Sequence, residues 1–376
     1  MHKNYKKSFR NSAHRTYTLS TTITHGVIAL ISKRLLLILQ VGATYIGTVV
    51  GAGFASGQEI VQFFTMFGSK GLLGIILTGL LFGWLGIKIL LISHRINATS
   101  YQDLVRYVCG DSLGSAFNLC IAVFLLGGLC VMLAGTGSIC FFYLSLPYNL
   151  GVLVTVILSG LIVLYGIRAI MLANSIVVPL LTLTAFAVSY MSLLHHGIPQ
   201  NLLLIAVNQH AFTSSWLLSA LLYTAYNMTL ALTLLSPMGG AIKDRQALLW
   251  GGMIGGAGLG ILAFMLVLVT LTHYPASILE ELPMLFITKD QGPYIIVSYI
   301  IVLWAEMLTT AIASLYGLAQ TVNRLTGLDY NYVVLVSAGI AVIGSQWGFG
   351  QLISLLYPLF GFISLIFLAT LALAKK

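Results

Sequence analysis

The sequence predicts an all-α integral membrane protein with ten transmembrane helices arranged as a 5+5 inverted repeat. Its composition points to a membrane protein, since 59% of the 376 residues are hydrophobic and 7% are charged, whereas soluble domains carry about 25% charged residues. Its apolar runs reach the roughly 20 residues that a helix needs to cross a bilayer. These runs lack the alternation of apolar and polar residues that membrane β-strands show. We therefore expect helices, because a spanning helix satisfies its own backbone hydrogen bonds.

Ten apolar runs follow one another, separated by Pro, Gly and charged residues. The polar, basic residues 1–34 carry no cleavage-like signal, and we expect them to form a disordered cytoplasmic tail. Residues 35–374 then form one transmembrane domain. The ten runs lie near 35–67, 71–94, 114–145, 149–167, 169–194, 213–236, 247–273, 292–323, 332–346 and 351–374.

The distribution of Lys and Arg predicts the orientation in the membrane. If the N-terminus is cytoplasmic, only Lys70 and Lys289 of the 18 Lys and Arg residues fall outside, as the positive-inside rule requires. An even number of spans also returns the C-terminus to the cytoplasm. Topology and anionic membrane lipid therefore explain the net charge of +9, and no nucleic-acid partner is needed. We expect a multi-pass protein of the cell membrane.

The first span contains the segment VGAGFASGQEI, residues 50–60, in an otherwise apolar run. Glycines at this depth predict a helix broken at 51–55, with free carbonyls before the break and free N–H groups around Ser56–Gln58. Such helix ends bind a solute carboxylate or a cation. The predicted binding residues here are Gly51, Ala52, Gly53, Phe54, Ser56 and Glu59. A straight helix with small residues for close packing is the alternative.

The sixth span repeats this pattern, because it places Tyr223, Tyr226 and Asn227 at mid-membrane. We predict that this span is also broken and that these three side chains bind the solute; an interhelical hydrogen-bond cluster is the alternative. The two polar segments open the first and second sets of five spans. Because five is odd, the second set enters the membrane from the opposite side, which predicts an inverted repeat of about 35–194 and 213–374 with a midplane site.

Two of the nine acidic residues, Glu59 and Glu306, lie inside apolar runs. A carboxylate there is costly unless it is protonated, paired or facing a wet cavity, so each is a candidate functional residue. An interhelical hydrogen bond from a neutral side chain is the alternative. On a helix, Glu306, Thr309 and Thr310 share one face.

The segment TYIGTVVGAGFASGQEI, residues 44–60, resembles the opening helix of the YkvI family of bacterial membrane proteins, over residues 35–374. More distantly, the 5+5 plan is similar to the LeuT-fold amino acid, polyamine and organocation transporter superfamily. That resemblance implies an ion site in which Thr309 and Thr310 of LTTAIAS face the carbonyls of Gly47 and Val50. Glu306 lies one turn before Thr309, where the superfamily usually has a small residue. Coupling to protons is therefore an alternative to coupling to sodium.

Three further segments have weaker signals. Gly252, Gly256 and Gly260 lie on one face of the seventh span and predict helix packing. His195, His196 and His210 fall in one connection, but the further ligands that would complete a metal site are not evident, so we predict no metal beyond a possible sodium ion. The segment 274–293 forms either a short helical lid or a plain loop.

These features predict a cation-coupled secondary transporter, or symporter, of a small organic solute of the amino-acid type. It works by alternating access and needs no cofactor besides a possible sodium ion. The alternative is a nutrient-sensing receptor of the spore-germination permease type, which binds without transport. An enzyme is disfavoured, since the sequence has no HExxH, activated nucleophile or metal cluster. Membrane lipid and the solute are the expected partners; the sequence says nothing of oligomeric state.

Overall fold

The structure, a computed structural model, describes residues 33–165, 167–198, 202, 205 and 211–374. All regular secondary structure in these residues is helical. Nearly all of the predicted tail, and His210, lie outside the described residues. A helical segment coincides with each predicted apolar run. These segments are residues 33–49 with α2 (Ala52–Ala55) and α3 (Gln58–Phe63), α4 (Ser69–Ile96), α5 (Tyr101–Tyr143), α6 (Tyr148–Tyr165), α7 (Ile167–His196), α8 (Trp216–Ala241), α9 (Arg245–Thr272), α11 (Pro293–Thr326), α12 (Tyr330–Gly344) and α13 (Phe349–Leu373).

Six helices in the described part of the chain are long and apolar enough to cross a membrane, within α4, α5, α8, α9, α11 and α13. Residues 148–164 of α6 form a shorter apolar helix. Large apolar side chains also point outward, with Leu80 and Leu335 each 69% exposed and Ile366 67% exposed. Exposed side chains of this kind suit lipid better than water, and the protein is a multi-pass membrane protein.

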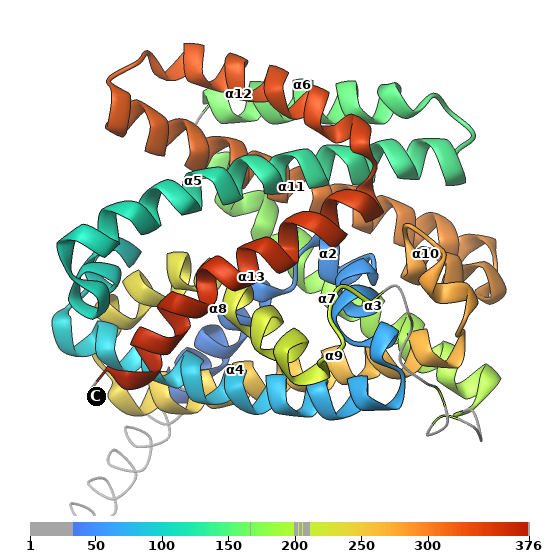
Figure 1. The fold of residues 1–376 in the computed structure, drawn as a ribbon, viewed down its shortest axis with the longest axis horizontal. Coiled ribbons are helices and arrows are strands. Elements are labelled where there is room, and N and C mark those ends of the chain that lie inside the picture. Colours follow the sequence, from blue (N-terminus) through green and yellow to red (C-terminus); the bar gives the residue numbers. More distant parts are fainter. Residues whose placement is uncertain (1–32, 166, 199–201, 203–204, 206–210, 375–376) are drawn as a thin grey trace, which may run out of the picture.

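The helices form two groups, which Figure 1 shows on opposite sides of the molecule. In the first group, α4 packs along both α8 and α9, and Tyr45 joins residues 33–49 to α4 through a hydrogen bond to the Phe82 carbonyl at 2.7 Å. In the second group, α11 packs on α5, α6 and α12. α13 contacts α8 of the first group and α5 of the second, so it connects the two.

The contact between α4 and α9 depends on small residues. A Cβ atom at Gly260 would lie 3.0 Å from Cα of Gly79, and one at Gly256 would overlap the backbone of Gly83. A Cβ atom at Gly252 would lie 3.0 Å from Ile87. The glycine face therefore packs against a neighbouring helix, as its spacing predicts, and lets the two backbones approach closely.

Polar caps fix several helix starts. Asp103, in the first turn of α5, accepts hydrogen bonds from the backbone N–H groups of Thr99 at 2.8 Å and Ser100 at 3.0 Å. The Thr99 bonds hold the pKa of the Asp103 carboxyl below its usual value. Asp244 caps α9 and also accepts a hydrogen bond from Arg34 at 2.6 Å, which lowers the pKa of Asp244. This ion pair ties the start of the first span to α9.

The prediction of a broken sixth span is wrong, because α8 runs as one helix from Trp216 to Ala241. Two of its buried polar side chains, Thr224 and Asn227, find partners on their own helix and need no opening. The Thr224 hydroxyl donates to the Ala220 carbonyl at 2.8 Å, and the Asn227 amide donates to the Tyr223 carbonyl at 3.0 Å. Back-bonding of this kind satisfies a polar residue inside a helix without breaking it.

The segment before α11 contains short helices: η3 (Ala276–Ile278), α10 (Pro283–Ile287) and η4 (Thr288–Gln291). It packs against the first span, since the Met284 N–H donates to the Ser56 carbonyl at 2.9 Å. The segment thus covers the α3 end of the first span.

Candidate functional site

The first span is interrupted at Val50 and Gly51. Val50 still donates its N–H to the Ile46 carbonyl at 2.9 Å, and the next turn begins with the bond from Ala55 to the Gly51 carbonyl, also 2.9 Å. Gly51 itself is extended, with φ −111° and ψ −176°. The carbonyl end of one helical segment and the start of α2 therefore meet at this point. A helix end leaves its last carbonyls without helical partners.

A second interruption follows at Ser56 and Gly57, where Gly57 has φ +82°, a conformation that favours glycine. The predicted free N–H groups at 56–58 are all used internally, which corrects the expectation that they face the solute. Ser56 donates to Ala52 at 2.8 Å, Gly57 donates to Phe54 at 3.1 Å, and Gln58 donates to the Ser56 hydroxyl at 3.3 Å. The break lies at 50–51 instead of across 51–55, because residues 52–55 form the short helix α2.

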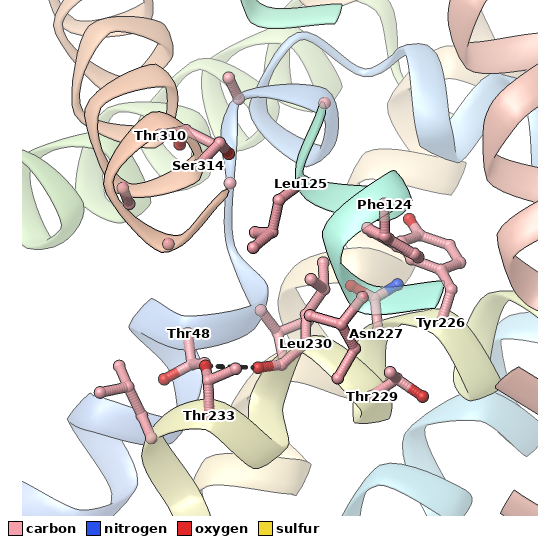
Figure 2. A pocket seen from close by; sticks show the side chains of 18 of the residues that line it. Thr48, Phe124, Leu125, Tyr226, Asn227, Thr229, Leu230, Thr233, Thr310 and Ser314 are labelled. Atoms are coloured by element: carbon pink, nitrogen blue, oxygen red, sulfur yellow. Dashed lines mark hydrogen bonds between the residues drawn. The ribbon is translucent and has the colours of Figure 1, made fainter. Parts of the chain in front are cut away.

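A cavity of about 590 Å³ lies beside the first interruption, a volume within the range of about 300–1,000 Å³ that small-molecule sites have. Figure 2 shows side chains from the first span, α5, α8 and α11 converging on it. Backbone residues 47–53 form one wall. The cavity therefore lies between the two helix groups, at the place where one helix exposes its backbone ends.

Glu59 and Tyr226 form the buried end of the cavity, with exposures of 5% and 1%. The Tyr226 hydroxyl donates a short hydrogen bond to Oε2 of Glu59, and Tyr357 packs on Tyr226 with ring centroids 5.2 Å apart. A Cβ atom at Gly53 would overlap the Glu59 carboxyl. Glycine at 53 is thus the residue that lets Glu59 cross the backbone of α2 and meet Tyr226.

Glu306 of α11 is the second acid in the cavity wall, and it is 3% exposed. Its Oε1 atom lies 3.5 Å from the Thr310 hydroxyl, at the limit of a hydrogen bond. Its Oε2 atom is buried and has no partner among the described residues. A buried carboxylate oxygen in this situation is open to a proton, a metal cation or an ammonium group.

The predicted site residues divide into those in the cavity wall and those behind it. Thr309 lies behind it, and its hydroxyl donates to the Glu306 carbonyl at 3.1 Å. Phe54, Ser56 and Tyr223 are fully buried outside the wall. The wall contains Gly47, Val50, Gly51, Ala52, Gly53, Glu59, Tyr226, Asn227, Glu306 and Thr310.

Sequence reasoning missed the opposite end of the cavity, which is formed by Tyr101 and Gln102 of α5 and by Gln320 and Thr321 of α11. Gln320 is exposed, in contrast to Glu59. A polar residue near a helix end carries little signal, because such ends face water in any membrane protein. Tyr357 of α13 was also missed, although a tyrosine beside Pro358 in an apolar run was a usable signal.

The electrostatics of the cavity favour cations. Among the described lining residues there are two acids, Glu59 and Glu306, and none is Lys, Arg or His. The carbonyl end of the first helical segment adds the negative end of a helix dipole. The arrangement can hold a cation or an ammonium group, whereas a multiply negative solute would meet no basic side chain in this wall.

The chain is similar to two proteins of Bacillus subtilis (strain 168). It is 36% identical to the uncharacterized membrane protein YkvI over 350 residues, which cover 90% of this chain and 95% of that protein. It is 27% identical to the uncharacterized protein YyaD over 331 residues, with coverage of 87% and 94%. No model of a known protein family matches the chain.

Solved structures of LeuT-fold transporters share the fold. MhsT in complex with L-phenylalanine matches with a TM-score of 0.61 at 17% identity, covering 90% of this chain and 92% of that one. The inward-facing conformation of Mhp1 matches with a TM-score of 0.60 at 13% identity, with coverage of 87% and 73%. A sodium-coupled sialic acid symporter matches with a TM-score of 0.57 at 14% identity, with coverage of 82% and 72%.

Proposed function

The chain belongs to the YkvI family of membrane proteins, and we propose that it is a cation-coupled secondary transporter of a small, amino-acid-like solute. One observation carries this proposal: a cavity at the break of the first span is lined by helix-end backbone and by two buried carboxylates. The neighbouring folds are those of transporters, MhsT and Mhp1 among them. In this reading residues 35–374 form one transporter domain with no chemical step.

The chemistry of the cavity suggests how the solute and the coupling ion share it. The ammonium group of an amino acid or amine would lie near the buried end, where Glu59 is held by Tyr226. The coupling cation would lie at Glu306, whose free oxygen and the adjacent Thr310 hydroxyl could be joined by carbonyls of Gly47 and Val50. Oxygen ligands of this kind suit sodium, and Glu306 alone suits a proton.

The helix grouping supports the inverted repeat. Counting five spans in each repeat, the first and second spans of both repeats lie in the first group: residues 33–49 with α4, and α8 with α9. The third and fourth spans of both repeats, α5 with α6 and α11 with α12, lie in the second group. Equivalent helices thus share a group, as alternating access by one group moving against the other requires.

The cavity opens toward the side that we assign to the cytoplasm. Its exposed end lies at the start of α5 and the end of α11, beside the helix ends that carry Arg95 and Arg106. The positive-inside rule assigns this side to the cytoplasm, and we therefore propose an inward-facing cavity and cytoplasmic termini. Cysteines introduced at positions 4 and 376 should stay unlabelled by an impermeant reagent added to whole cells; labelling of either one contradicts this orientation.

A ligand screen by thermal shift tests the proposal before any transport assay. Purified protein would be heated with a panel of amino acids, amines and dicarboxylates, with and without sodium and at two pH values. A bound ligand raises the free energy of unfolding by RT ln(1 + [L]/Kd), and the unfolding temperature rises with it. We expect stabilisation by an amine or amino acid and none by dicarboxylates. Stabilisation by dicarboxylates alone would argue against the role given to Glu59 and Glu306.

A further inference from the structure

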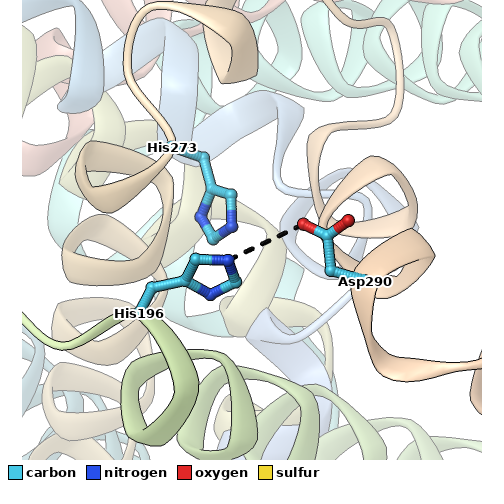
Figure 3. A group of neighbouring side chains, drawn as sticks. All are labelled: His196, His273 and Asp290. Carbon is cyan, nitrogen blue, oxygen red and sulfur yellow. Dashed lines mark ion pairs between the residues drawn. The ribbon is translucent and has the colours of Figure 1, made fainter.

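Three side chains that are distant in the sequence meet at the end of the molecule opposite the mouth of the cavity. His196 is the last residue of α7, His273 caps the end of α9, and Asp290 lies in η4. Their nitrogen and oxygen atoms lie within 4.8 Å of one another, and Nε2 of His196 is 3.8 Å from Oδ2 of Asp290. Figure 3 shows both rings and the carboxylate turned toward one point.

Each histidine is already oriented as a metal ligand. Nδ1 of His196 lies 3.2 Å from the Ser192 carbonyl, and Nδ1 of His273 lies 2.9 Å from the Val269 carbonyl. A carbonyl only accepts, so each Nδ1 is the donor, and in the corresponding neutral tautomer the lone pair of each ring is on Nε2. Metal-binding histidines are held in this way by a hydrogen bond from their other nitrogen.

The lone pair of His273 has no partner in the described structure. Its Nε2 atom is buried and makes no hydrogen bond, while the His196 ring lies edge-on to it with centroids 4.8 Å apart. A buried polar atom without a partner is uncommon and calls for an explanation. A cation between the two rings and the carboxylate would supply that partner.

We propose that His196, His273 and Asp290 bind a divalent transition metal ion of the zinc class. Two imidazoles and one carboxylate suit zinc, nickel or copper, whereas magnesium and calcium prefer oxygen ligands alone. Zinc with three protein ligands takes water in the fourth position. Tetrahedral ligands at zinc lie about 3.3 Å apart for bonds of about 2.0 Å, and the exposed side chains of His196 and Asp290, 40% and 59% exposed, are free to close the remaining gap.

Metal binding would fasten η4 to the ends of α7 and α9. The segment that contains η4 also holds the first span, through the bond from Met284 to the Ser56 carbonyl. The metal therefore stabilises the closed end of the molecule. If the protein transports by alternating access, as proposed above, zinc favours the state that is open at the other end. The metal site itself does not depend on that function.

The neighbouring His195 offers a matched control, because it is an exposed histidine one residue away and is outside the cluster. Full-length protein with a tag that contains no histidine would be stripped with a chelator in detergent. Cobalt would then be titrated by its visible absorption, and zinc by competition and by thermal shift. The variants are His196→Ala, His273→Ala, Asp290→Asn and His195→Ala.

We expect one metal ion per chain in the wild type and in His195→Ala, with a zinc-dependent rise in unfolding temperature. His196→Ala and His273→Ala should each lose at least tenfold in affinity, and Asp290→Asn should bind more weakly than wild type. If His273→Ala lowers stability without metal, the exposed His196 and Asp290 variants decide the question. Binding in the double variant His196→Ala with Asp290→Asn equal to that in wild type, or an equal loss in His195→Ala, overturns the site.

Discussion

A methyl group at Gly53 should disturb the candidate site more than one at Gly51, two residues away. The added Cβ in Gly53→Ala would overlap the Glu59 carboxyl, lying 2.8 Å from its Cδ and 3.0 Å from its Cγ. Glu59 must then turn away and lose the Tyr226 hydrogen bond, and a buried polar group left without its partner costs about 1–3 kcal/mol. Overpacking adds about 1–3 kcal/mol. We expect a total destabilisation of about 2–6 kcal/mol.

Gly51→Ala is the matched control, because a Cβ there would meet no atom within 4 Å and its φ of −111° suits any residue. Its effect should stay within about 1 kcal/mol. The assay is the unfolding free energy in mixed micelles titrated with denaturing detergent. A double-mutant cycle tests the contact between positions 53 and 59 directly. In a Glu59→Ala background, Gly53→Ala should lower the unfolding free energy much less than in the wild type, since the two sites are in contact. Equal effects of Gly53→Ala and Gly51→Ala, or additivity in the cycle, would refute the reasoning.

Three other outcomes follow from the structure. Glu306→Gln should abolish the cation or proton dependence of solute binding, measured by thermal shift at several sodium concentrations and pH values; unchanged dependence would leave Glu59 as the coupling group. Gly256→Val should lower the unfolding free energy by at least about 1 kcal/mol through overpacking against α4, whereas Gly339→Val, where a Cβ meets open space, should change it little. The pKa of Asp103 is lowered in the fold, so its contribution to stability is present above the unfolded pKa of about 3.9 and is lost as the pH falls through the folded value. Asp103→Asn should therefore lower the thermal midpoint at pH 7, and the difference from wild type should shrink below about pH 4. A difference that stays constant with pH would contradict this.

The helices themselves were predictable, because a long apolar run determines a membrane helix almost by itself. The break in the first span was visible as a cluster of glycines, but its position was not. Residues 52–55 satisfy their hydrogen bonds as the short helix α2, and Gly57 provides the second turn with a φ of +82°. Composition alone does not reveal which glycine leaves the helix.

The sixth span shows why polar residues are a poorer signal than glycines. Thr224 and Asn227 donate to carbonyls of their own helix, so their polarity needs no interruption. Asn227 still lines the cavity, although the helix that carries it is continuous.

The cluster of His196, His273 and Asp290 was beyond sequence reasoning for a different reason. Its members come from three elements and share no spacing motif, and the sequence around His195 and His196 contains neither His273 nor Asp290. Only the packing of α7, α9 and η4 brings the three together.

Solute uptake into proteoliposomes with an imposed ion gradient tests the central claim most directly. A labelled ligand taken from the thermal-shift screen would be supplied outside, with an inward gradient of sodium or of protons and with an ionophore control. The account predicts accumulation above the external concentration when one of these gradients is present, and its collapse when the ionophore dissipates that gradient. Binding of the same ligand without uptake under any gradient would contradict the transporter assignment and favour a receptor.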